Sequence, residues 1–142
     1  MTSKVKLNCI LLIDDSDADN FYNTDIIEAC EVATRVDIVT STMAAIEYLS
    51  NIILGVSETS IPDLIFLDIN MPKMNGFKFL EKLDALPGKD VLKDSKIIVL
   101  TTSMNPTDRE KISLFPAVSD YMHKPLNDDS LLALIEKYFK KT

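Results

Sequence analysis

Carboxylates stand at the ends of two short apolar runs. Asp14 and Asp15 follow the run Leu7–Ile13, and Asp68 follows the run Leu64–Leu67. If these runs are neighbouring strands of a parallel sheet, the carboxylates converge, and like charges that lie close together are costly unless a cation joins them. Mg²⁺ suits such a site because it prefers oxygen ligands and can bridge to a phosphoryl oxygen. The acids therefore indicate a magnesium site.

Two hydrogen-bond donors follow other apolar runs. Thr101 follows residues 97–100, and Lys124 follows residues 119–122. A hydroxyl and an ammonium beside three acids suit an anionic, oxygen-rich group such as phosphoryl. Thr101 alone could be an ordinary helix cap and Lys124 an ordinary turn residue, and a single Asp at a strand end could also cap the next helix. Capping by an Asp uses only one carboxylate oxygen, however, and does not account for a cluster of three acids.

The elements that must position these residues alternate along the chain. Five apolar runs rich in β-formers lie at residues 7–13, 36–40, 64–67, 97–100 and 119–122, and each is followed by a helical pattern. After the first run that pattern consists of Tyr22, Ile26, Ala29, Cys30 and Ala33. Alternating βα units with unbroken apolar strands predict a doubly wound α/β fold with a five-stranded parallel sheet. Ligands of such sheets bind at the carboxyl ends of the strands.

Composition limits the class of protein. The chain has 142 residues, 46% hydrophobic and 26% charged, which is typical of one domain with one core. We expect a single domain over residues 1–142 with no output domain. The two cysteines, Cys9 and Cys30, lie in apolar stretches and are expected to be plain buried thiols. Loops at residues 55–62 and 87–94 are longer than the fold needs and should lie on the surface.

The charge balance argues against nucleic acid as a partner. Fifteen Lys and Arg against 22 Asp and Glu give a net charge of −7, which repels phosphate backbones. No apolar run is long enough for a membrane helix, and the N-terminus lacks the layout of a signal peptide. We therefore expect a cytoplasmic protein with no membrane partner.

Taken together, these residues resemble the receiver domain of two-component response regulators, of the chemotaxis-regulator type. The similarity runs from about residue 7 to residue 138. It comprises the acidic pair Asp14 and Asp15, the block 68–76 (DINMPKMNG), Thr101 at a strand end, and Lys124 with Pro125. The resemblance implies a flavodoxin-like fold with strand order 2-1-3-4-5.

The resemblance also implies roles for the acids. Asp68 would be the nucleophile that accepts a phosphoryl group. Asp15 and the backbone carbonyl of Asn70 would join Asp68 around Mg²⁺, and Asp14 would act mainly through bound water. Asn70 and Ser103, two positions beyond the acceptor and the threonine, would tune hydrolysis of the phosphorylated form.

The remaining implied roles belong to the two strand ends that carry donors. Lys124 would pair with Asp68 and then with the phosphoryl oxygens, and Pro125 would follow a cis peptide bond. Thr101 would hydrogen-bond the phosphoryl group, and Tyr121 would be the aromatic residue that turns inward when Thr101 moves. Because the spacing from Thr101 to Lys124 is one residue longer than the family pattern, Thr102 is the alternative threonine.

Such a protein is a signalling module that assists its own phosphorylation and dephosphorylation, not an enzyme. A sensor histidine kinase or a phosphotransfer protein would supply the phosphoryl group, docking near Phe21 and Tyr22. A downstream protein, or a second copy of the chain, would read the face made by the fourth helix, fifth strand and fifth helix. The residues expected on this face are Phe115, Tyr121, Met122, Lys137 and Lys140.

Three alternatives remain at this point. A receiver-like interaction module that is never phosphorylated should have lost an acid, the threonine or the lysine, and this chain has all of them. A Mg²⁺-dependent phosphohydrolase with an aspartate nucleophile needs a second acid where Asn70 stands, and a cap domain. A flavin-binding electron carrier needs a phosphate-binding loop, which the acids after the first strand would oppose.

Overall fold

In the part of the chain that the structure describes, five strands and five α-helices alternate, as predicted. The computed structural model describes residues 6–57, 60–70, 75–102 and 105–139. The strands are β1 (Leu7–Ile13), β2 (Ala33–Val39), β3 (Leu64–Leu67), β4 (Lys96–Thr101) and β5 (Val118–His123). The helices are α1 (Asp17–Cys30), α2 (Thr42–Ile53), α3 (Gly76–Asp84), α4 (Pro106–Ser113) and α5 (Asp128–Phe139), with a short 3₁₀ helix, η1 (Lys89–Leu92).

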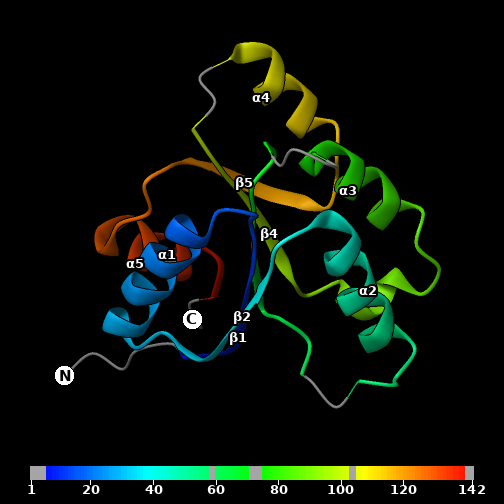
Figure 1. Cartoon of the computed structure of the whole chain (residues 1–142), viewed down its shortest axis with the longest axis horizontal. Coiled ribbons are helices and arrows are strands. Elements are labelled where there is room, and N and C mark those ends of the chain that lie inside the picture. The colour runs from blue at the N-terminus through cyan, green and yellow to red at the C-terminus, as the bar shows by residue number, and fades with distance from the viewer. Residues whose placement is uncertain (1–5, 58–59, 71–74, 103–104, 140–142) are drawn as a thin grey trace.

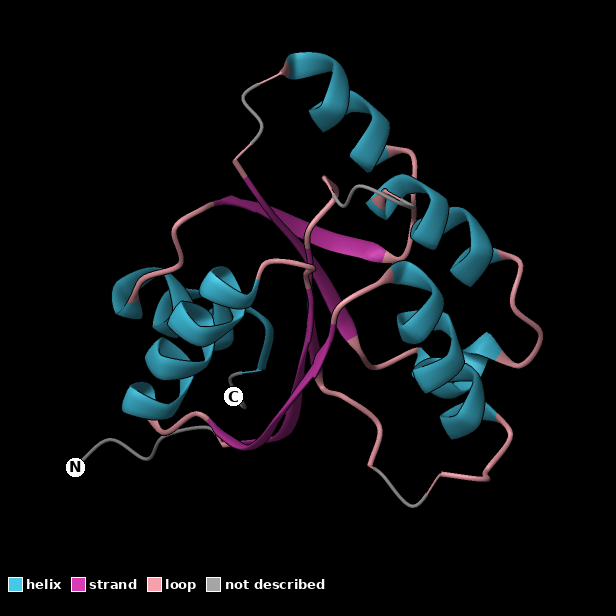
Figure 2. Cartoon of the chain, viewed as in Figure 1, coloured by secondary structure: helices cyan, strands magenta, loops and turns pink. Residues whose placement is uncertain are grey.

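The strands form one parallel sheet between two layers of helices. Their order is β2-β1-β3-β4-β5, which confirms the predicted topology. Helices α1 and α5 cover one face, and α2, α3 and α4 lie on the other (Figure 1). In Figure 2 the sheet runs through the centre of the molecule, with helices on both sides.

Two hydrophobic clusters fill the spaces on either side of the sheet. Along β1, Ile10 and Leu12 pack into the cluster under α1 and α5, whereas Leu11 and Ile13 pack into the cluster under α2 and α3. A strand that is buried on both faces has no polar alternation, which explains the unbroken apolar runs in the sequence.

The apolar face predicted for α1 was wrong in part. Ala33 belongs to β2, because α1 ends at Cys30 and the next residue adopts a left-handed conformation (φ 55°) that turns the chain into the sheet. Ile26 is partly buried and packs against the cluster under α1 and α5, as predicted, but the helix also buries Ile27 and two asparagines, Asn20 and Asn23. The side chain of Tyr22 is 42% exposed.

The remaining expectations for cysteines and loops have mixed outcomes. Cys9 and Cys30 are both buried free thiols, as predicted. The loop at residues 87–94 is not purely a surface feature, because it contains η1, which contacts α2, and inserts Leu92 into the core. Among the residues that the structure describes, no helix has both the length and the apolar character to cross a membrane.

Candidate acidic site at the carboxyl end of the sheet

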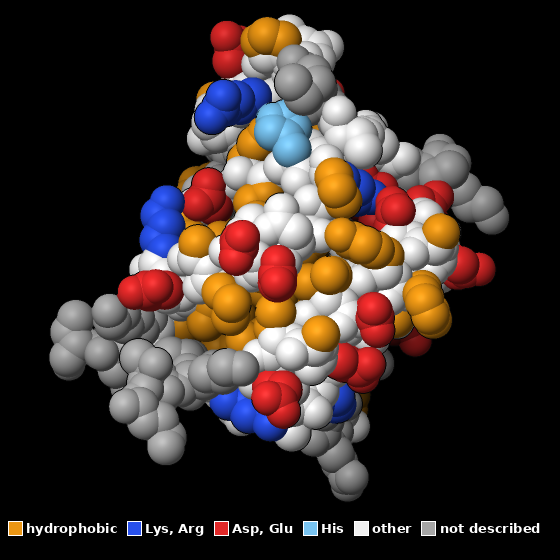
Figure 3. Space-filling model, turned by 90° about the vertical axis from the view of Figure 1, so that its left-hand side faces the viewer, with side chains coloured by type: hydrophobic (Ala, Val, Ile, Leu, Met, Phe, Trp, Pro, Cys, Tyr) orange, Lys and Arg blue, Asp and Glu red, His pale blue; other side chains and the backbone are white. Residues whose placement is uncertain are grey.

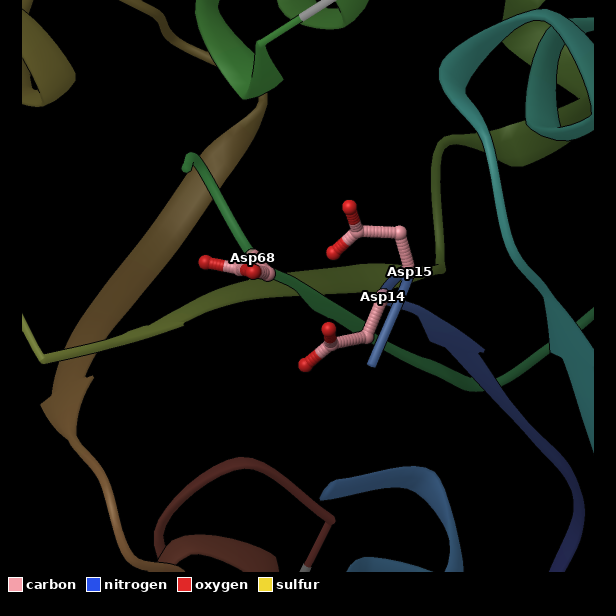
Figure 4. A group of neighbouring side chains, drawn as sticks. All are labelled: Asp14, Asp15 and Asp68. Atoms are coloured by element: carbon pink, nitrogen blue, oxygen red, sulfur yellow. The ribbon is translucent and has the colours of Figure 1, made fainter. Parts of the chain in front are cut away.

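Asp14, Asp15 and Asp68 converge at the carboxyl ends of β1 and β3. These strands are neighbours, with Ile13 opposite Leu67, so the residues that follow them emerge side by side. One carboxylate oxygen from each of the three acids lies within 4.8 Å of the others. Figure 4 shows the three side chains extending into the same region beyond the strand ends.

Local hydrogen bonds hold the two buried acids in place. Asp14 is 4% exposed, and its Oδ1 accepts a hydrogen bond from the backbone N–H of Ser16 at 2.9 Å. The buried Asn20 side chain donates to the Asp14 carbonyl at 2.8 Å, which ties α1 to the end of β1. Asp68 is 8% exposed, and its Oδ1 accepts from the backbone N–H of Asn70 at 3.1 Å. Asp15 is exposed.

The electrostatics of the site disfavour the charged form of Asp68. Burial raises the pKa of Asp68, and repulsion from Asp14 and Asp15 raises it further. The N–H of Asn70 and the ammonium of Lys124 lower the pKa of Asp68, but they offset only part of the rise. A divalent cation would relieve this repulsion, and the clustered carboxylate oxygens are the ligands that Mg²⁺ prefers.

Lys124 provides the positive charge of the site. Its Nζ donates hydrogen bonds to Asp14 Oδ2 and Asp19 Oδ2, each at 2.7 Å, and lies 3.7 Å from Asp68 Oδ2. Burial alone would lower the pKa of Lys124, but the hydrogen bonds to Asp14 and Asp19 raise it above its ordinary value. The peptide bond between Lys124 and Pro125 is cis.

Asp19 is the site residue that sequence reasoning missed. It lies in the first turn of α1, which Ser16 caps by accepting a hydrogen bond from the Asp19 N–H at 3.1 Å. An acid in a first helical turn is ordinarily explained by the helix dipole. Only the position of the turn directly after the acidic pair could have drawn attention to Asp19.

Thr101 lies at the end of β4 and faces the site. It is fully buried, and its Oγ1 accepts a hydrogen bond from Asn70 Nδ2 at 3.1 Å. The extra residue before Lys124 is absorbed early in β5. There a register shift sets Val118 opposite Ile97 and Asp120 opposite Ile98, so the end of the strand stays aligned with Thr101. Thr102 is exposed.

Tyr121 lies on β5 opposite Val99 and packs against the cluster under α2 and α3. Its ring makes an edge contact with His123 at a centroid distance of 5.1 Å. The Arg109 guanidinium of α4 lies 5.6 Å from the ring centroid. The tyrosine therefore connects the strand that carries Lys124 to α4. Two residues named in the sequence predictions, Ser103 and Lys140, lie outside the described residues.

The raised pKa of Asp68 leads to a stability prediction. The folded state favours the protonated carboxyl of Asp68 more than the unfolded state does. The stabilisation that this protonation contributes is complete below the ordinary aspartate pKa and is lost as the pH rises through the raised pKa of Asp68. Without Mg²⁺ at neutral pH, we expect Asp68→Asn to increase the free energy of unfolding by about 0.5–2 kcal/mol. The increase should shrink towards low pH, where the wild-type carboxyl is protonated. Urea titration across pH measures both effects.

Added Mg²⁺ provides the control for this prediction. It should stabilise the wild type more than Asp68→Asn, because a ligand that binds the folded state more tightly stabilises it more at the same concentration. An Asp68→Asn variant that is less stable than the wild type in chelator at neutral pH would contradict the prediction that the charged Asp68 carboxylate destabilises the folded state.

The comparisons with known proteins agree with this geometry. The family model described as the response regulator receiver domain matches residues 10–136. Response regulator Rcp1 from Synechocystis is 34% identical over 100 residues, which cover 70% of this chain and 65% of Rcp1. An uncharacterized 14.6 kDa protein from Leptolyngbya boryana is 31% identical over 85 residues, 60% of this chain and 62% of that protein. In both relatives the match spans less than two thirds of their length.

Solved structures show the same similarity over almost the whole chain. A two-component response regulator from Cytophaga hutchinsonii superposes with a TM-score of 0.83 at 32% identity, covering 96% of this chain and 99% of that one. The phosphorylated cyanobacterial phytochrome response regulator RcpA superposes with a TM-score of 0.74 at 28% identity, covering 95% of this chain and 96% of that one.

Proposed function

This chain belongs to the response regulator receiver domain family, whose function is phosphorylation on an aspartate, and on that premise we propose that Asp68 is the phosphoacceptor in a Mg²⁺-dependent reaction. The observation that carries the proposal is the placement of Asp68. It is nearly buried, has two further carboxylates within 4.8 Å, and lies 3.7 Å from the Lys124 ammonium. This arrangement matches the needs of a phosphoryl group bound with a divalent cation.

The proposed reaction transfers one phosphoryl group. A carboxylate oxygen of Asp68 attacks the phosphorus of the donor. The bond from phosphorus to the leaving nitrogen or oxygen breaks, and its electron pair departs with the donor. When bound at Asp14, Asp15, Asp68 and the Asn70 carbonyl, Mg²⁺ would supply positive charge that offsets the repulsion between the carboxylates and the phosphoryl oxygens.

Two residues of this chain would contact the phosphoryl oxygens. Lys124 already lies within ion-pair distance of Asp68, so its ammonium can donate to a group attached there. The Thr101 hydroxyl is within hydrogen-bond distance of Asn70, beside the acceptor, and can turn towards the same group. These donors would stabilise the charge that develops during transfer.

Intact-mass measurement tests the proposal directly. The protein is incubated with acetyl phosphate and Mg²⁺, and the expected result is a mass increase of one phosphoryl group that excess chelator prevents. A receiver-like module that is never phosphorylated would show no increase. Rapid, continuous turnover of acetyl phosphate without accumulation of the adduct would favour the phosphohydrolase alternative.

Asn70 is proposed to control the lifetime of the phosphorylated form. Its exposed side chain donates to Thr101 Oγ1, so it lies beside the path by which water would reach the phosphorus. We expect Asn70→Ala to change the rate of phosphoryl loss by about 2- to 10-fold, the effect of one hydrogen bond. Loss of the mass adduct after donor removal measures the rate. Asn8→Ala, at an exposed position at the opposite end of β1, is the control and should leave it unchanged.

We propose the same tuning role for Ser103. Bulky and acidic replacements at position 103 should alter the lifetime of the adduct while labelling still occurs. Unchanged rates for such replacements at both positions 70 and 103 would contradict this assignment.

Tyr121 is proposed to transmit the state of Asp68 to the surface. A phosphoryl group carries about 1.5 to 2 negative charges and would draw Thr101 and Lys124 towards it, which leaves space for the ring. We expect NMR signals of Tyr121, His123 and Arg109 to shift when Mg²⁺ and beryllofluoride, a phosphoryl mimic, are added. Identical spectra with and without the mimic would count against the switch, and Asp68→Asn should show no shift.

Two surfaces are proposed for partners. A histidine kinase or phosphotransfer protein would dock around α1, where Phe21 is 78% exposed and Tyr22 42% exposed. Figure 3 shows the face that carries α1 and α5, on which hydrophobic side chains lie among acidic ones. A downstream protein or a second copy of the chain would read α4, β5 and α5, where Tyr121 and the exposed Lys137 lie. Pull-downs with and without beryllofluoride distinguish the two surfaces. Only binding to the surface formed by α4, β5 and α5 should depend on the state of Asp68.

A further inference from the structure

The ammonium of Lys124 is shared unequally among three carboxylates. Asp14 and Asp19 each accept a hydrogen bond from it at 2.7 Å, whereas Asp68 lies beyond hydrogen-bond distance at 3.7 Å. Asp19 comes from α1 and lies outside the cluster of Asp14, Asp15 and Asp68. In this structure the shortest contacts of Lys124 are therefore made to acids other than the acceptor.

We propose that Asp19 is a positioning residue that holds Lys124 towards α1. Phosphorylation of Asp68 then requires Lys124 to exchange its hydrogen bond with Asp19 for one with a phosphoryl oxygen. This inference rests on the proposed phosphoacceptor role of Asp68. It assigns to Asp19 a restraint on the reaction, because the lysine that stabilises the transferred group is engaged elsewhere beforehand.

Burial explains why Asp19, and not Asp14, releases the lysine. The Asp14 side chain is 6% exposed, so water cannot readily replace the hydrogen bond that it accepts from Lys124. The Asp19 side chain is 44% exposed and can be hydrated when Lys124 leaves. The long, flexible stem of a lysine lets its ammonium move between acceptors without movement of the backbone.

The pair is also accessible from outside. A cavity of about 240 Å³ lies beside it, lined by Asp19, Tyr22, Asn23, Thr102, Lys124 and Pro125. Water can therefore reach Asp19 as the contact breaks. A phosphoryl group carries more negative charge than a carboxylate, so the exchange becomes favourable once that group is on Asp68.

Paired charge-removing substitutions test the restraint. Asp19→Asn weakens the contact with Lys124, and Asp17→Asn removes the same charge from the same helical turn at an exposed position. The initial rate of labelling by acetyl phosphate with Mg²⁺ is measured over a range of donor concentrations. At saturating donor, we expect Asp19→Asn to label about 2- to 5-fold faster than Asp17→Asn, which is the size of one partly exposed ion pair.

The dependence on donor concentration separates the restraint from a general charge effect. Loss of a negative charge favours approach of the anionic donor and should lower the half-saturating concentration similarly in both variants. Release of Lys124 should raise the saturated rate in Asp19→Asn alone. Asp19→Glu restores a carboxylate and should return the rate towards that of the wild type. Beryllofluoride should also bind Asp19→Asn about 2- to 5-fold more tightly than Asp17→Asn.

The outcomes distinguish the two proposals. Equal saturated rates for the Asp19 and Asp17 variants, or a slower Asp19→Asn, would overturn the restraint while leaving the phosphoacceptor role intact. Absence of labelling in the wild type would refute the phosphoacceptor role, and the restraint with it. If Asp19→Asn does not fold, as judged by circular dichroism, Asp19→Ser is compared with Asp17→Ser in the same assay.

Discussion

The Asp68→Asn variant should take up no phosphoryl group from acetyl phosphate under conditions that label the wild type fully. An amide oxygen is a poor nucleophile and carries no charge to help bind the cation, so the variant lacks both functions proposed for Asp68. The fold should persist, because Asn matches Asp in size and the backbone of the Asp68 loop is unchanged. The expected effect is complete loss of the mass adduct.

Two measurements make this result interpretable. Asp25→Asn removes a carboxylate from an exposed position on α1 and should label as the wild type does. Peptide mapping of the labelled wild type should place the adduct on Asp68, not on Asp14 or Asp15. Normal labelling of Asp68→Asn, or an adduct mapped to either neighbouring acid, would show that the acceptor has been assigned to the wrong residue.

Replacing Gly76 with Ala should destabilise the protein and disturb the loop that carries Asp68. A Cβ atom at position 76 would lie 2.6 Å from Ile69 Cα and 3.0 Å from the Asp68 carbonyl oxygen. Both atoms belong to the backbone, and the Gly76 N–H already donates to the Ile69 carbonyl at 3.0 Å. The clash can therefore be relieved only by moving α3 or the segment from Asp68 to Asn70.

Two opposing effects decide whether Gly76→Ala raises or lowers the free energy of unfolding. Ala favours a helix over Gly by about 1 kcal/mol, whereas overpacking against fixed atoms costs about 1–3 kcal/mol and sometimes more. We expect the steric cost to exceed the gain, giving a lower free energy of unfolding and slower labelling of Asp68. Urea denaturation and the acetyl phosphate assay measure the two effects.

A matched substitution on α3 isolates the steric cost. Lys82 is exposed on the same helix, so Lys82→Ala should change stability by less than about 0.5 kcal/mol. A Gly76→Ala variant that is more stable than the wild type would show that the loop moves away at no cost, and that Gly76 does not fix the position of Asp68.

Much of the fold could be predicted from the sequence because its signals are local. The bounds of β1 and β3 agree with the apolar runs. Both strands are buried on both faces and contain few polar residues, so each strand begins and ends where its apolar run does. Parallel strands point their carboxyl ends to one edge, and the strand order implied by the family resemblance places β1 beside β3, so Asp14, Asp15 and Asp68 converge. The sequence by itself therefore determined the parallel α/β architecture and the acids at the strand ends, and the resemblance supplied the strand order.

Tertiary structure decided the features that depend on contacts between distant residues. The hydrogen bond between Lys124 and Asp19 joins residues 105 positions apart, and no local sequence pattern predicts it. The register shift in β5, which keeps Lys124 aligned with Thr101, depends on how β5 pairs with β4. Likewise, α1 buries Asn20 because its amide can donate to the Asp14 carbonyl. Such pairings depend on geometry after the elements pack, because a polar side chain is stabilised in the interior only where a partner lies within hydrogen-bond distance.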